Sequence, residues 1–177
     1  MSERITLQKK INVAVLFFLL IILSSTQTAQ DGIIVFDETS NQRMPLGKFD
    51  RSVFLDSSFV DWFTDEYDLY SADENVLQVL KEQIDGLHIK IIMGTWCSDS
   101  RREVPRFYKI LDALRFDEQN VDLICVDRAK VGLNDEVDGL NINFVPTFIF
   151  YTNEIEVGRI IETPDVTLEI DFESILK

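Results

Sequence analysis

Gly94-Thr95-Trp96-Cys97-Ser98-Asp99-Ser100 is the stretch that decides how this 177-residue chain folds. A largely apolar run over residues 89–93 precedes it, and a pattern typical of an amphipathic helix follows over residues 101–114. Cys97 is therefore expected where a buried strand ends and a helix begins. The dipole and the free amide groups of a helix N-terminus stabilise a thiolate relative to a thiol. The stretch thus predicts a nucleophilic cysteine.

Strands and a helix are predicted on the C-terminal side of this stretch. Residues 121–126 are nearly all apolar, which is typical of a parallel strand buried on both faces. Val145-Pro146-Thr147 lies at the start of a second apolar run, and residues 144–151 and 155–161 are predicted to form a hairpin. A last helix is expected over residues 165–176. The order strand–helix–strand, then strand–strand–helix, predicts an α/β fold.

A Trp-Cys pair at a strand–helix junction, followed by Val-Pro-Thr before a strand, resembles the thioredoxin superfamily. The sequence of residues 94–105 is also similar to that of a subgroup of exported bacterial thioredoxin-like proteins. The resemblance covers residues 89–176 and implies a three-layer αβα sandwich with a mixed central sheet. It also implies a cis Val145–Pro146 bond beside the nucleophile. Pro105 matches a kinking proline in the active-site helix of the family.

One departure from the family pattern defines the expected chemistry. The family's second cysteine, three residues after the first, is Ser100 here. A dithiol reductase uses its second thiol to resolve the mixed disulfide formed by the first, and a serine cannot do this. The Ser100 hydroxyl can still donate a hydrogen bond to the Cys97 thiolate. A buried acid of the family is also replaced, by Ile91, so the resemblance implies a monothiol site.

The predicted site has five residues. Cys97 and Ser100 are the predicted catalytic pair, and a groove formed by Trp96, Val145 and Pro146 is predicted to bind an extended client segment through free backbone groups. Nearby charged side chains are expected to influence the ionisation of the Cys97 thiol in opposite directions. Asp99 would oppose ionisation of the thiol, and Arg101 or Arg102 would favour it if either points back toward the sulfur.

The second cysteine and the single histidine are not expected to take part. Cys125 lies inside a strand pattern, and a free cysteine in such a place usually behaves as a small buried hydrophobic residue. His88 is expected at the far end of the strand that leads to Cys97, too distant for a Cys–His pair. Two cysteines and one histidine cannot supply a clustered zinc set, so neither a metal nor another cofactor is expected.

The N-terminus predicts export. Positive residues at positions 4, 9 and 10 precede an almost unbroken apolar stretch over residues 11–23, and small polar residues follow. This is the pattern of a secretory signal peptide over residues 1–29, and it predicts a periplasmic or extracellular protein. Gln27 is a poor residue at the −3 position, so an uncleaved membrane anchor is the alternative. The apolar stretch is short for that, because a spanning helix needs about 20 apolar residues.

The sequence predicts a mostly helical N-terminal extension over residues 30–86. The resemblance implies that a thioredoxin-like core follows over residues 87–177. A short edge strand is expected at residues 33–36, and the loop-like composition of residues 37–50 predicts no regular element. Two helices should follow, over residues 59–70 and 76–84, the first capped by Ser57 or Ser58.

The formal net charge of −14 argues against nucleic acid as a partner, because an acidic surface repels phosphate backbones. The expected partners are a client protein or a small disulfide, with an external thiol as the reductant. Contact with a membrane is expected only if the N-terminal segment stays attached.

Three functions are compatible with the sequence. The first is monothiol thiol–disulfide exchange through Cys97. The second is a redox-inactive module that binds extended client segments in the groove beside Pro146. The third is a thiol that handles peroxides or sulfenic acids, since an exposed and ionised cysteine also oxidises readily.

Overall fold

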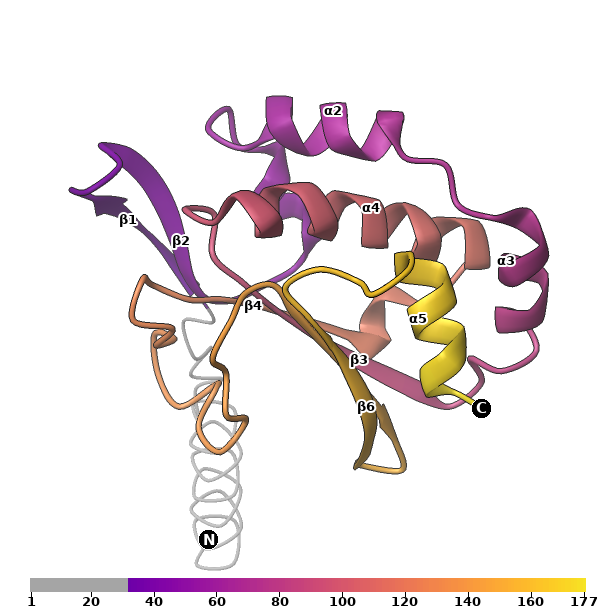
Figure 1. Ribbon diagram of the computed structural model, residues 1–177. Coiled ribbons are helices and arrows are strands. Elements are labelled where there is room, and N and C mark those ends of the chain that lie inside the picture. The colour runs from indigo at the N-terminus through magenta and orange to yellow at the C-terminus, as the bar shows by residue number, and fades with distance from the viewer. Residues whose placement is uncertain (1–31) are drawn as a thin grey trace, which may run out of the picture. The chain divides into compact units, whose positions relative to one another are not determined.

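The computed structural model describes residues 32–177, which form a six-stranded sheet with helices packed on one face (Figure 1). The strand order is β1-β2-β4-β3-β5-β6, and the sheet is mixed because β3 runs parallel to β4 while all other neighbours are antiparallel. The strands are β1 (Gly32–Asp37), β2 (Gln42–Phe49), β3 (Leu87–Met93), β4 (Val121–Cys125), β5 (Thr147–Thr152) and β6 (Ile155–Ile161).

The four α-helices of the described residues share one hydrophobic core with one face of the sheet. Phe63, Leu80, Phe107 and Phe172, one from each helix, are buried together in this core. The helices are α2 (Val60–Leu69), α3 (Glu74–Leu80), α4 (Ser98–Leu114) and α5 (Leu168–Ile175), and two 3-10 helices, η1 (Arg51–Leu55) and η2 (Glu118–Asn120), connect elements.

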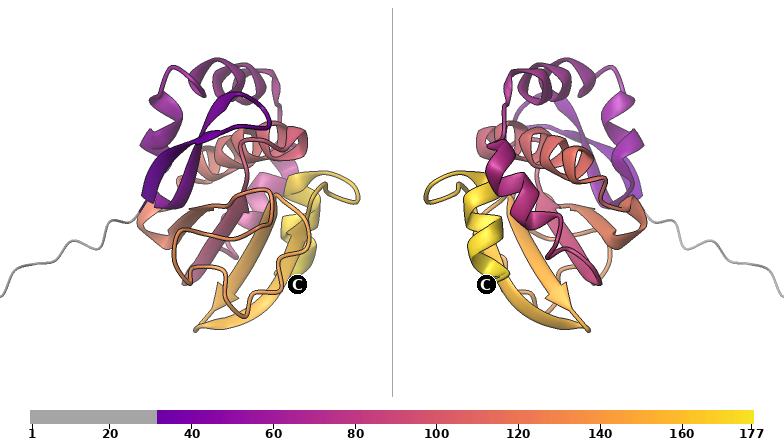
Figure 2. Two further views of the ribbon diagram at one scale, coloured as in Figure 1. Left: turned by 90° about the vertical axis from the view of Figure 1, so that its left-hand side faces the viewer. Right: turned by 90° about the vertical axis from the view of Figure 1, so that its right-hand side faces the viewer.

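The opposite face of the sheet is covered by an irregular segment, residues 127–146 (Figure 2). Ile92, Ile124 and Ile149 are buried on this face, and Leu140 and Ile142 of the segment pack against them. Both faces of the sheet are covered as expected, but the layer on this face is irregular, whereas an αβα sandwich implies helices there.

The second half of the chain follows the predicted order, β3–α4–β4 and then β5–β6–α5, which confirms the α/β prediction and a thioredoxin-like arrangement. Helix α4 starts at Ser98 and continues through Pro105. Because proline has no N–H, the carbonyl of Arg101 lacks its usual intrahelical donor. The buried positions of α4 recur at helical spacing, which places the helix flat on the sheet.

The N-terminal part differs from the sequence prediction in two places. Residues 33–36 do lie in an edge strand, but the prediction of a loop over residues 37–50 was wrong, because most of these residues form β2. Pro45 is tolerated there since this part of β2 pairs with β1 alone. The predicted serine cap of α2 was also wrong: Phe59 occupies the N-cap, without a side-chain hydrogen bond.

Between residues 32 and 177, the structure contains no helix with the length and apolar character needed to cross a membrane. The predicted signal peptide, residues 1–29, lies outside the described residues.

Candidate functional site

Cys97 lies at the position where the sequence places it, between β3 and α4. It is the N-cap residue of α4 with extended backbone angles (φ −93°, ψ 128°), and its side chain is half-buried. The first bond of the helix runs from the Arg101 N–H to the Cys97 carbonyl at 3.1 Å. The N–H groups of the first helical turn therefore have no intrahelical acceptor and are directed toward the start of the helix.

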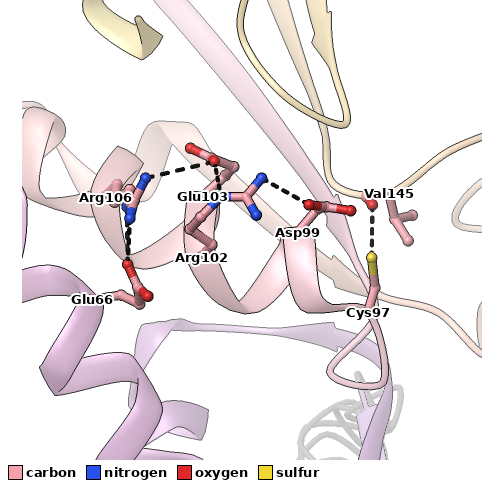
Figure 3. Close-up of polar contacts among 7 residues, drawn as sticks. All are labelled: Glu66, Cys97, Asp99, Arg102, Glu103, Arg106 and Val145. Atoms are coloured by element: carbon pink, nitrogen blue, oxygen red, sulfur yellow. Dashed lines mark hydrogen bonds and ion pairs between the residues drawn. The ribbon is translucent and has the colours of Figure 1, made fainter.

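The thiol of Cys97 faces the loop that precedes β5. Its Sγ donates a hydrogen bond to the carbonyl oxygen of Val145 at 3.1 Å, as Figure 3 shows. The Val145–Pro146 peptide bond is cis, as the family resemblance implied. Cys97 and Val145, which are 48 residues apart in sequence, are thus brought together where β3 ends and β5 begins.

Trp96 is held beside Cys97 by the contacts of its indole ring. The indole Nε1 donates to the Val126 carbonyl at 3.0 Å, and the guanidinium of Arg128 lies over the ring, 5.4 Å from its centroid. A Cβ atom at Gly94 would overlap the indole, so the glycine that opens the motif makes room for this orientation.

Ser100 is fully buried below the loop. Its hydroxyl accepts a long hydrogen bond of 3.4 Å from the Gly94 N–H. In the part of the chain that the structure describes, no hydrogen bond joins Ser100 to Cys97. The catalytic role of Ser100 remains a prediction.

The charged side chains in the first two turns of α4 bond to groups other than the Cys97 sulfur (Figure 3). Arg102 donates to Asp99 at 2.7 Å and to Glu103 at 2.5 Å. Arg101 turns away as well, donating through Nε to the Thr95 carbonyl at 2.5 Å. The two arginines that the sequence offered as neighbours of a thiolate therefore make other contacts.

Cys125 is buried and free, as predicted. Its side chain belongs to the core beneath the helices, whereas Cys97 packs against the core of the opposite sheet face. Burial in apolar surroundings raises the pKa of the Cys125 thiol. Neither its position nor its ionisation makes it a partner for Cys97.

His88 lies near the start of β3, at the other end of the strand from the Cys97 loop. Its Nε2 is 2.8 Å from Asp122 Oδ2, and Lys48 also pairs with this carboxylate at 2.5 Å. Burial raises the pKa of Asp122, but the hydrogen bonds from Lys48 and His88 outweigh it, and the net pKa is lowered. This cluster is separate from the site.

The structure adds three residues that the sequence analysis missed. Asp37, Gln42 and Arg128 contact the loop before Cys97 directly or through an arginine. Asp37 and Arg128 are 91 positions apart, so no local pattern could have paired them.

No protein-family model and no curated protein matches the chain. Among solved structures, a thioredoxin O2 from Arabidopsis thaliana in its oxidised state is 22% identical, with a TM-score of 0.39, and the match covers 56% of this chain and 85% of that one. A protein of unknown function from Pseudomonas aeruginosa is 12% identical, with a TM-score of 0.49, and the match covers 72% of this chain and 82% of that one. Both are similar to this chain in fold at most.

Proposed function

We propose that this protein is an exported thioredoxin-like protein that carries out thiol–disulfide exchange through Cys97 by a monothiol route. The observation that carries the proposal is the position of Cys97, half-buried at the N-terminus of α4 and within 3.1 Å of the Val145 carbonyl before a cis-proline. A half-buried thiol at the start of a helix can be reached by a disulfide.

The exchange proceeds in two displacements. The Cys97 thiolate attacks one sulfur of a client disulfide, a bond forms between Cys97 and that sulfur, and the other client sulfur leaves as a thiolate. An external monothiol, as its thiolate, then attacks the client sulfur of the mixed disulfide. This releases Cys97 as a thiolate and leaves the client joined to the external thiol. Electrons balance because every step exchanges one disulfide for another.

The second step needs an outside thiol because the chain has no resolving thiol within reach. Ser100 has no sulfur, and Cys125 is buried in the core on the other side of the sheet. The mixed disulfide should therefore persist until an external thiol arrives.

The client segment would lie across Trp96, Val145 and Pro146. In the resting state the Val145 carbonyl accepts a hydrogen bond from the Cys97 S–H, so an extended segment that pairs with this carbonyl would compete with the thiol. Binding and release of the sulfur would then be coupled.

Two observations favour a second candidate, a redox-inactive binding module. A hydrogen bond from S–H to a carbonyl is available only to the protonated thiol, and the nearby Arg101 and Arg102 are bonded elsewhere. The S–H bond and the bonding of these two arginines away from the sulfur would suit an unreactive thiol in a peptide-binding groove.

The first experiment measures the reaction of the folded protein with 5,5′-dithiobis(2-nitrobenzoic acid). The wild type should release one equivalent of thionitrobenzoate and keep the other as a stable adduct on Cys97, visible by intact mass. Ser100→Cys should release a second equivalent, because the introduced thiol attacks the adduct. It should also reduce insulin faster than the wild type does.

Cys97→Ser is the matched control and should release nothing while folded. Alkylation of Cys97 by iodoacetamide as a function of pH separates the two candidates. A thiolate-like reaction near neutral pH supports exchange. A slow reaction, no gain in Ser100→Cys and full biological activity of Cys97→Ala would replace exchange with the binding module.

A further inference from the structure

The tip of the β1–β2 hairpin lies against the loop that carries the nucleophile. Asp37 and Gln42 form the last residue pair of the hairpin, on either side of its turn. Figure 1 shows the hairpin beside the N-terminal end of α4, and each of the two side chains bonds an arginine that contacts the loop.

The first connection runs through Arg128. Its guanidinium donates to Asp37 Oδ2 through Nη2 at 2.8 Å and through Nε at 3.1 Å, and it stacks on the Trp96 ring. Asp37 is itself fixed, because it accepts hydrogen bonds from the Ser40 hydroxyl at 2.6 Å and from the Thr39 N–H at 3.1 Å. Arg128 and Ser40 hold the pKa of Asp37 far below its usual range, so the ion pair persists throughout neutral and mildly acidic pH.

The second connection runs through Arg101. Its Nη2 donates to Gln42 Oε1 at 2.8 Å, while its Nε donates to the Thr95 carbonyl. Thr95 and Trp96 are the two residues immediately before Cys97, so the two arginines hold consecutive residues of the loop.

We propose that the hairpin tip positions the nucleophile loop, with Asp37 holding Arg128 against Trp96 and Gln42 holding Arg101 against the Thr95 carbonyl. Arg128 and Arg101 are positioning residues in this arrangement. The effect on exchange rests on the proposed function, but the effect on the indole does not.

Arg128 contributes mainly by orienting the Trp96 indole and less by its charge. Its charge is matched by that of Asp37, whose Oδ2 accepts from both Nε and Nη2, so little net charge remains to act on the Cys97 sulfur. What the pair does fix is one face of an indole whose Nε1 is already bonded to Val126. Trp96 is thereby constrained on two sides next to the reacting thiol.

The test labels both tryptophans with 5-fluorotryptophan and records two 19F resonances, assigned with Trp62→Phe. Arg128→Gln and Asp37→Asn each remove the ion pair. Arg43→Gln is the matched control, because Arg43 lies on the same hairpin and pairs at 2.6 Å with Asp56, away from the loop. Circular dichroism and thermal unfolding verify that each variant is folded.

The Trp96 resonance should shift and broaden in Arg128→Gln and Asp37→Asn, while the Trp62 resonance stays in place. Arg43→Gln should leave both unchanged. If Cys97 exchanges disulfides, the adduct should form roughly 10- to 100-fold more slowly in the two variants, as expected when a reacting loop is displaced.

An unchanged Trp96 resonance in folded Arg128→Gln and Asp37→Asn would overturn the proposal, as would equal shifts in Arg43→Gln. A variant that does not fold is replaced by Arg128→Lys, which keeps the charge and the ion pair but loses the planar stack. A Trp96 shift there sustains the proposal, and its absence refutes it. Should the indole move while Cys97 proves inert to disulfides, the positioning role stands and the exchange function fails.

Discussion

Cys97 has two kinds of neighbour, the N–H groups at the start of α4 and the Val145 carbonyl, which accepts a hydrogen bond from its S–H. Under the proposed function, a client segment that pairs with the Val145 carbonyl would compete with this bond and free the sulfur for attack.

Cys125 provides a residue-scale prediction about alkaline stability. Its pKa is raised by burial, so the folded state keeps the proton that the unfolded state loses above about pH 8.5. The contribution is therefore fully present below that pH and is lost as the pH rises. In a Cys97→Ala background, the free energy of unfolding in urea should fall by about 1.4 kcal/mol per pH unit from this group alone.

The control is Cys97→Ala combined with Cys125→Ala. That protein should be less stable at every pH, because packing is lost, but its stability should decline less steeply between about pH 8.5 and pH 10. Equal alkaline slopes in the two proteins would contradict the prediction.

At the scale of elements, the sequence revealed those whose pattern is local. The nucleophile loop, α4 and the β5–β6 hairpin carry strong apolar periodicity or proline and turn signals, and all were predicted close to their observed bounds. Strand β2 was missed because Pro45, Gly47 and two charged residues give it the composition of a loop. It is a strand only because β1 and β4 lie beside it. The contacts of Arg101 and Arg128 with the hairpin tip were not predicted for the same reason, since they join residues that are distant in sequence.

The packing of β6 against α5 gives an element-scale prediction. A Cβ at Gly158 would come within 2.7 Å of the Ile175 side chain, so Gly158→Ala should force the helix away from the strand. We expect a loss of about 1–3 kcal/mol in the free energy of unfolding, as for other overpacked sites. Denaturant unfolding measures it.

Ile175→Ala removes the atoms that the new methyl group would meet. The double variant should therefore lose less stability than the sum of the two single variants, a coupling of about 0.5 kcal/mol or more. Additive losses would show that the strand and the helix do not meet at this point.

At the scale of the whole molecule, the charge and the N-terminal sequence agree with the proposed export. The net charge of −14 opposes binding to anionic surfaces. The proposed monothiol exchange would need a thiol from outside the chain, and residues 11–23 form an apolar stretch of the length found in secretory signals.

The export of the chain is a prediction that a fusion can test. Residues 1–32, joined to an alkaline phosphatase that lacks its own signal, should give active enzyme outside the cytosol of a bacterial host. Leu16→Arg combined with Leu20→Arg is the matched control, because two charges in the middle of the apolar stretch should prevent recognition as a signal. The full-length protein recovered from the same compartment should begin near Gln30. Recovery with an intact N-terminus from the membrane would support the anchor instead, and recovery of intact protein from the cytosol would refute export altogether.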